Sequence, residues 1–168
     1  MTDILNQHKY SIWLMPSQND KVSVYEQIYG LSKENHSPIF PPHCTLYGPV
    51  FNLDTAKGII DKIEMNPFLA TSFGLNQSDN IWKTVFIELE MNDRLNKLNQ
   101  IFQNAFSSNY DFKPHISLIY KTMTKDQRLA IITEIEIQKS YDFSGIAVVD
   151  TSGPVDEWES VYQSVWNK

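Results

Sequence analysis

The stretch PHCTLY at residues 42–47 is nearly repeated as PHISLIY at residues 114–120. In each copy a histidine follows a proline, and a threonine or serine stands two places after the histidine. Side chains alternate between the two faces of a β-strand, so each histidine shares a face with this hydroxyl residue. The repeat therefore predicts two similar strands, and a twofold relation between them would bring both histidines to one cleft.

The segments around the two copies follow the same order: a proline-containing loop leads into the motif strand, and a helix and a further strand come next. Apolar spacing predicts helices at residues 20–34 and from residues 54, 92 and 124 onward, the last starting with the capping box TKDQ. Further strands are expected at residues 10–15, 68–75, 81–90, 141–150 and 158–166. The order predicts an α+β fold of two pseudo-twofold lobes, with antiparallel sheets lining a central cleft and helices outside. A single domain is expected to span residues 1–168.

Three details of these elements depend on single residues. The first helix is expected to present Val22, Tyr25 and Ile28 on its apolar face. The last helix is expected to bury Leu129 in the same way. The pair Gly48-Pro49, which follows the first motif, is expected to end that strand early.

Composition limits the class of protein. The chain is 42% hydrophobic and 12% aromatic, which fits a globular domain, and its formal net charge is −6. A protein that coats nucleic acid usually carries a basic face, so a small phosphate is a more suitable partner than long RNA or DNA. No apolar run approaches the roughly 20 residues of a membrane span, and the first residues lack a signal-peptide pattern. A cytoplasmic monomer is expected, and the one cysteine fits a reducing compartment.

The paired motifs point to acid–base chemistry on a phosphate. Two histidines near neutrality are a natural general base and general acid, so His43 and His115 are expected to be catalytic. Phosphoryl transfer runs roughly in line, which requires the base and the acid on opposite sides of phosphorus. Thr45 and Ser117 are expected to donate hydrogen bonds to the non-bridging oxygens, where charge develops. Neither motif contains the carboxylates of a typical metal site, so no metal or other cofactor is expected.

At these residues the chain resembles the 2H phosphoesterase superfamily, which is defined by two His-x-Thr/Ser-x motifs, and more narrowly the plant and yeast cyclic phosphodiesterases. The resemblance extends to YSIWLMP at residues 10–16, FPPH at residues 40–43 and WESV at residues 158–161. It implies a bilobal α+β fold and metal-independent hydrolysis of small cyclic phosphates. The implied substrates are ADP-ribose 1″,2″-cyclic phosphate, a by-product of tRNA splicing, and nucleoside 2′,3′-cyclic phosphates.

Aromatic and basic residues near the motifs are further candidates for the site. The resemblance implies that Tyr120 is a site residue, but it lies an odd number of residues after His115 and reaches the cleft only if its strand bulges or ends first. Trp13 matches an aromatic residue near the cleft of the family, and its pattern fits stacking on a nucleobase and packing in the core equally well. For Trp82, core packing is the favoured interpretation. Lys121, directly after the second motif, is a candidate phosphate contact.

Other functions remain open on the sequence alone. A related enzyme could act on RNA ends, as a 2′-5′ ligase-like phosphodiesterase or an exonuclease, which the acidic balance and the short chain disfavour. A non-catalytic module could bind nucleotides in the same cleft, although both pairs of histidine and hydroxyl are intact. A structural domain without a ligand is a third alternative, which the doubled motif disfavours.

Overall fold

The structure is a computed structural model that describes residues 7–167. Over this range it contains seven β-strands and four α-helices. The strands are β1 (Tyr10–Pro16), β2 (Cys44–Val50), β3 (Phe68–Gln77), β4 (Val85–Leu89), β5 (His115–Ile119), β6 (Ser140–Asp150) and β7 (Glu159–Val165). The helices are α1 (Gln18–Asn35), α2 (Leu53–Asp61), α3 (Asp93–Ala105) and α4 (Lys125–Glu134), and short 3₁₀ turns are η2 (Ile81–Lys83) and η3 (Val155–Glu157). No helix among the described residues is long and apolar enough to cross a membrane.

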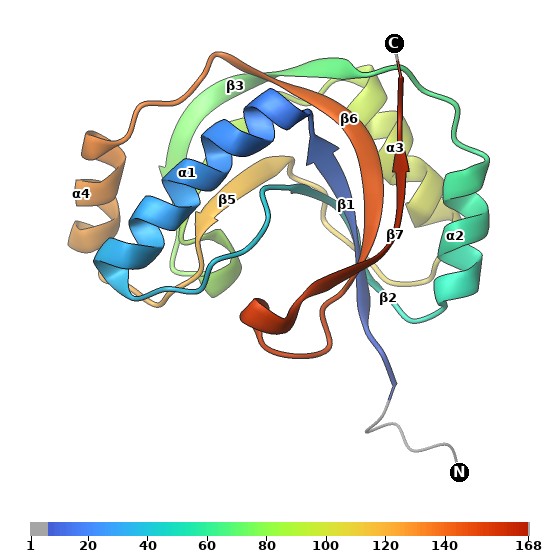
Figure 1. Ribbon diagram of the computed structural model, residues 1–168, viewed down its shortest axis with the longest axis horizontal. Helices are drawn as coiled ribbons and strands as arrows, with labels where there is room; N and C mark the ends of the chain where they lie inside the picture. The colour runs from blue at the N-terminus through green and yellow to red at the C-terminus, as the bar shows by residue number, and fades with distance from the viewer. Residues whose placement is uncertain (1–6, 168) are drawn as a thin grey trace.

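The described strands form one antiparallel sheet with the order β2-β1-β6-β3-β4-β5, and β7 pairs with β6. The strand β3 joins two halves of this sheet, because residues 68–71 pair with β6 and residues 72–77 pair with β4. A register shift and the positive φ of Gly74, 119°, lie at the start of the second part and bend the strand. The sheet curls, as Figure 1 shows. The motif strands β2 and β5, which stand at opposite ends of the strand order, thereby come into contact.

Helices pack against both halves of the sheet. Helix α1 contacts β1 and β5, α3 contacts β2, α4 contacts β3 and β4, and α2 contacts β6 and β7. Figure 1 shows α1 and α4 on one side of the molecule and α2 and α3 on the other. Antiparallel strands with separate helices confirm the expected α+β class. The division into two pseudo-twofold lobes stays a prediction, because the strands run in one continuous order.

The buried faces of two helices differ from the expectation. In α1 the buried stripe includes Val24, whereas Val22 and Tyr25 are 47% and 42% exposed. In α4 Ile131 is buried, and Leu129 is 41% exposed. Both helices carry apolar residues on more than one side, so spacing alone leaves several possible inner faces. The face that becomes buried is the one that the neighbouring strands cover.

A single strand was expected at residues 81–90. The structure instead has the turn η2 followed by the strand β4. The side chain of Asn80 accepts a hydrogen bond from the Trp82 backbone N–H at 3.0 Å, and the Asn80 carbonyl accepts one from the Lys83 N–H at 2.9 Å. Such local bonds compete with strand pairing and turn the chain before β4. Trp82 consequently lies at the surface, 49% exposed, and not in the core.

The Gly48-Pro49 pair does not end β2, contrary to the expectation. The strand continues to Val50, and its pairing with β1 contains a bulge: Tyr10 pairs with Val50, whereas Ile12 pairs with Tyr47. An advance of two residues along β1 is therefore matched by an advance of three residues along β2, which is the extra residue of the bulge. The extra residue removes the proline from the regular ladder, where its missing N–H would leave a bond unmade.

Two glycines allow a matched test of how β6 packs against β7. A Cβ atom on Gly145 would lie 2.6 Å from the carbonyl oxygen of Ser164, whereas one on Gly30, inside α1, would meet nothing within 4 Å. We expect Gly145→Ala to lower the free energy of unfolding by about 1–3 kcal/mol through overpacking. Gly30→Ala should raise it by about 0.5–1 kcal/mol through helix propensity. Urea unfolding measures both, and a Gly145→Ala protein as stable as the wild type would contradict this packing.

Candidate active site

A cleft of about 750 Å³ is lined by residues from both halves of the sheet. Trp13, His43 and Thr45 line it from β1 and the start of β2. His115 and Tyr120 line it from β5 and the position just after that strand. Five of the six predicted site residues therefore meet at one surface. A second cavity, of about 470 Å³, lies between α2 and α3 and contains none of them.

Each motif histidine is oriented by its own backbone. Nδ1 of His43 lies 2.7 Å from the carbonyl oxygen of Pro41, and Nδ1 of His115 lies 2.8 Å from that of Lys113. A carbonyl oxygen can only accept, so Nδ1 carries the proton and donates in both rings. Nε2 is therefore the unprotonated nitrogen of each neutral ring. In both copies the accepting carbonyl belongs to the residue two positions before the histidine. The two motifs therefore share this hydrogen bond as well as their sequence pattern.

Burial holds both imidazoles in the neutral form. His43 is 4% exposed, and burial lowers its pKa to about 3, while the Pro41 hydrogen bond opposes the shift and the charge of His115 adds to it. Burial also lowers the pKa of His115, and the charge of Lys83 adds to that effect. At neutral pH each ring can accept a proton. Either ring must gain a proton before it can act as an acid.

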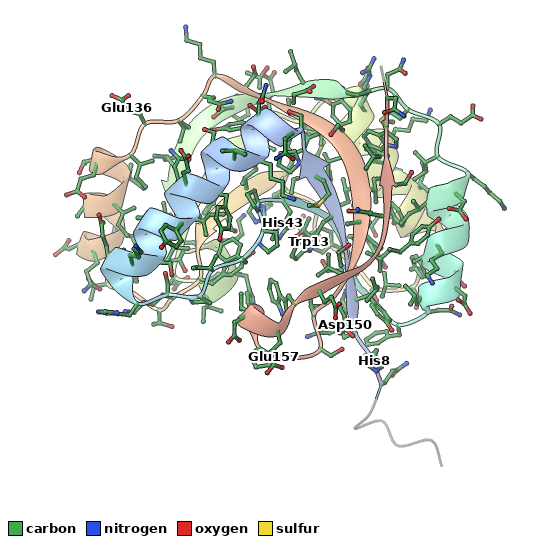
Figure 2. All side chains as sticks on the ribbon, in the orientation of Figure 1. His8, Trp13, His43, Glu136, Asp150 and Glu157 are labelled. Carbon is green, nitrogen blue, oxygen red and sulfur yellow. The ribbon has the colours of Figure 1, made fainter. Side chains whose placement is uncertain are left out.

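Trp13 forms a wall behind His43. The two rings are stacked, with 3.5 Å between their centroids and 6° between their planes, and Figure 2 shows them together near the middle of the molecule. The strand register explains the contact: Trp13 pairs with Thr45, so both face the cleft, and His43 precedes Thr45 by two residues. Trp13 is only 2% exposed. The imidazole of His43 thus covers the face of the Trp13 ring that was expected to be available for stacking on a nucleobase.

Tyr120 reaches the cleft because β5 ends one residue before it, at Ile119. The register with β4 also shifts, between Val85 and Phe86. The Tyr120 hydroxyl lies 3.5 Å from Nε2 of His43, at the long limit of a hydrogen bond. Burial raises the pKa of Tyr120, so the hydroxyl stays protonated and can donate to Nε2.

The hydroxyls of the two motifs have different surroundings. Thr45 lines the cleft, whereas Ser117 is 3% exposed and donates a hydrogen bond of 2.8 Å to the backbone carbonyl of Trp82. Ser117 thereby connects β5 to η2. Phosphate binding by Ser117 stays a prediction, and the bond to η2 is a role that the sequence did not indicate.

Three residues of the cleft were missing from the predicted site. Trp82 and Trp158 stack with 5.7 Å between ring centroids, and Trp158 meets Trp13 edge-on at 5.8 Å. Lys83 also lines the cleft, whereas Lys121 does not, because its amine donates to a backbone carbonyl at the end of α1. These residues share only aromatic or basic character. The turns that bring them to the cleft belong to neither motif. The sequence offered only weak signals: core packing was the favoured interpretation for Trp82, and Trp158 belongs to the WESV segment of the resemblance.

The sequence matches the profile of the family described as "Cyclic phosphodiesterase-like protein" over residues 9–166. The chain belongs to this family. Crystal structures with a similar fold include E. coli LigT complexed with 3′-AMP, with a TM-score of 0.64 and 16% identity over 96% of this chain and 99% of that chain. Another is TT0787 of Thermus thermophilus, with a TM-score of 0.62 and 15% identity over 94% and 97% of the two chains. No curated protein matches the sequence.

The family match and the shared fold confirm the resemblance to the 2H phosphoesterase superfamily, and they support phosphoesterase activity for this cyclic phosphodiesterase-like protein. A closer relation to the plant and yeast enzymes stays a prediction. Within residues 7–167, no group of three or more His, Cys, Asp and Glu side chains is placed to hold a metal ion.

The buried His43 should make the stability of the protein depend on pH. Its pKa is about 3 in the folded protein, against an ordinary value of 6.5. Between these values the unfolded chain binds a proton that the folded protein does not, so stability falls as the pH is lowered. Through His43 alone, we expect a loss of up to about 2 kcal/mol between neutral pH and about pH 5. Urea unfolding over this pH range measures the loss.

Two variants separate the contribution of His43 to the pH dependence of stability from the contributions of the other titratable groups. His43→Gln removes the imidazole and should flatten the pH dependence over the same range. His36→Asn changes an exposed histidine in the left-handed position that ends α1, which asparagine tolerates, and should leave the dependence as it is. A His43→Gln protein with the pH dependence of the wild type would rule out a buried neutral His43.

Proposed function

We propose that the protein hydrolyses small cyclic phosphates, either nucleoside 2′,3′-cyclic phosphates or ADP-ribose 1″,2″-cyclic phosphate, with His43 and His115 as acid–base catalysts. The observation that carries this proposal is the pair of imidazoles in one cleft, each with Nδ1 bonded to its own backbone and Nε2 unprotonated. Membership of the cyclic phosphodiesterase-like family supports it. We further propose that the protein acts as a cytoplasmic monomer, without a long nucleic acid or a membrane as partner.

The size of the cleft supports a ligand of about one nucleotide. Its volume of about 750 Å³ lies in the range of pockets that enclose a small organic ligand. LigT, which shares the fold, has been crystallised with 3′-AMP, with ATP and with NADP+. A mononucleotide cyclic phosphate or an ADP-ribose derivative falls within this range of ligand sizes.

In the proposed reaction a water molecule attacks phosphorus, and Nε2 of one imidazole takes a proton from that water. The bond between phosphorus and one ring oxygen breaks, and the other imidazole, protonated at Nε2, gives that oxygen a proton. The product is a ring-opened phosphomonoester, and the proton has moved from one imidazole to the other. The negative charge of the bound phosphate raises the pKa of both imidazoles, which favours the protonated ring that burial disfavours in the free protein.

The other cleft residues have proposed roles that follow from where they lie. Thr45 donates a hydrogen bond to a non-bridging oxygen, and Ser117 does so when its hydroxyl rotates away from the Trp82 carbonyl. The Tyr120 hydroxyl keeps its place beside the His43 ring. Trp82 offers the more exposed aromatic surface and stacks on a nucleobase in place of Trp13, whose own face is covered.

Replacing either histidine should nearly abolish turnover. We expect His43→Ala and His115→Ala each to lower kcat for 2′,3′-cyclic AMP by about 10²–10⁴-fold, because each removes one proton transfer. Phosphorus NMR of the products measures the rate and shows which ester bond breaks, and circular dichroism checks the fold. His36→Asn should keep the full rate. Full activity in both alanine variants would refute the mechanism.

Other results would favour the alternative functions. Binding of AMP by the wild type, without turnover of any cyclic phosphate, would favour a non-catalytic nucleotide-binding module. Binding of an RNA oligomer much more tightly than of a mononucleotide would favour an enzyme that acts on RNA ends.

The pH profile of the reaction should reflect the lowered histidine pKa values. One imidazole must be protonated, and in the free enzyme both pKa values lie below the ordinary 6.5. Since kcat/KM reports the free enzyme, it should already decrease with rising pH below the ordinary histidine pKa of 6.5. The profile of kcat reports the bound state, in which the phosphate raises the pKa values, so it should decrease at higher pH. Steady-state kinetics from about pH 4 to 9 measure both, and coincident profiles would contradict this role of the phosphate.

A further inference from the structure

The cleft concentrates positive charge in an acidic protein. The whole chain has a formal net charge of −6. Among the described residues, those that line the cleft include three lysines, Lys9, Lys83 and Lys113, and one carboxylate, Asp111. Because both cleft histidines are held neutral by burial, the lysines carry the positive charge of the site in the free protein.

Lys83 lies beside the second motif. Its amine sits over the ring of Phe86, 4.6 Å from the ring centroid. The Phe86 ring in turn meets the His115 imidazole edge-on, with 5.5 Å between centroids. Partial burial lowers the pKa of Lys83, and the nearby charge of Lys113 adds to the effect. The amine is therefore partly removed from water, and its charge is near enough to act on the pKa of His115.

Among the described residues, no carboxylate forms an ion pair with Lys83, although the charges of Glu88 and Asp111 are near enough to oppose the lowering of its pKa. The ion pairs within residues 7–167 are His8–Asp150 and Lys113–Asp111. The carboxylate of Glu88 lies on the strand next to His115, but it accepts a hydrogen bond of 2.7 Å from Asn76. An amine that is partly desolvated and makes no direct ion pair among the described residues is suited to binding an anion.

The backbone that carries Lys83 is held in place from two directions. Its N–H donates to the Asn80 carbonyl at 2.9 Å, and its carbonyl accepts from the hydroxyl of Ser78. The preceding carbonyl, that of Trp82, accepts the 2.8 Å bond from Ser117 of the second motif. The motif thus fixes the turn from which the Lys83 side chain extends.

We propose that Lys83 binds the phosphate of the substrate next to His115, an inference that rests on the function proposed above. A cyclic phosphodiester carries a negative charge, and more charge develops on its non-bridging oxygens as water attacks. The hydroxyls of the two motifs are neutral donors, and the imidazoles are neutral in the free protein. Lys83 supplies the cation that the two motifs lack.

The same position makes Lys83 act on His115. The charged groups near this imidazole are Lys83 on η2, Glu88 on β4, and Lys113 before β5, which pairs with Asp111; the neutral His43 lies across the cleft. In the free protein the Glu88 charge favours protonation of His115, whereas the Lys83 charge disfavours it. A phosphate bound by Lys83 offsets that charge. Lys83 is thus both a phosphate contact and a residue that links phosphate binding to the protonation of His115.

The test compares Lys83→Met with Lys33→Met. Lys33 is a matched control, because its amine also lies over an aromatic ring, 4.5 Å from the centroid of Tyr29, on α1 and outside the lining of the cleft. Inorganic phosphate is titrated into each protein and followed by the NMR signals of the histidine rings. We expect Lys83→Met to weaken phosphate binding, and to raise KM for 2′,3′-cyclic AMP, by about 10- to 100-fold. Lys33→Met should change neither.

A second measurement, the pKa of His115, distinguishes an electrostatic role of Lys83 from a purely structural one. Without phosphate, the pKa of His115 measured by NMR should be higher in Lys83→Met than in the wild type, because a nearby positive charge is gone. Lys83→Arg keeps the charge and should keep the lowered pKa and most of the phosphate affinity. If Lys83→Met does not fold, Lys83→Gln provides the same two readings.

The outcomes separate this inference from the proposed function. Unchanged phosphate affinity and an unchanged His115 pKa in Lys83→Met would overturn the role of Lys83, even if the wild type hydrolyses cyclic phosphates. If the wild type hydrolyses no cyclic phosphate but Lys83→Met loses phosphate binding, the proposed hydrolysis fails and the phosphate contact stands.

Discussion

The hydrogen bond from each motif histidine to the carbonyl two residues before it is the interaction on which the candidate site depends. It places the proton on Nδ1 and leaves Nε2 unprotonated in each neutral ring. In both copies a proline, Pro42 or Pro114, stands between the accepting carbonyl and the histidine. Proline restricts its own φ and keeps the preceding residue extended, which limits where that carbonyl can point. The proline of each motif thus helps to orient the imidazole by restricting the position of the carbonyl that accepts its hydrogen bond.

Burial and charge act in opposite directions in this cleft. Burial of His43 and His115 disfavours the protonated imidazoles that acid catalysis requires. In the proposed function, the lysines of the same cleft attract the phosphate of the substrate, whose charge then favours protonation. If this proposal holds, protonation of the histidines depends on the ligand: burial disfavours it in the free protein, and the bound phosphate favours it.

Much of the candidate site could be predicted from the sequence, and the exceptions have physical causes. Alternation along a strand correctly grouped His43 with Thr45, because it is a property of the backbone itself. The conditional prediction for Tyr120 was met, because β5 ends at Ile119. The inner face of α4 was wrong, because Leu129 and Ile131 are both apolar and only the docked strands choose between them. The position of Trp82 was wrong because the side chain of Asn80 replaces strand pairing with a turn.

The sequence by itself determined the local features: the two motif strands, the capping box at residues 124–127, and the residue types that phosphate chemistry requires. Each depends on neighbours within a few positions, where backbone geometry and side-chain hydrogen bonds act directly. Only the tertiary structure decided that β2 and β5, at opposite ends of the strand order, would meet, and that Trp13 would stack on His43. Those contacts follow from the bend of β3 and from strand register, which join residues far apart in the chain.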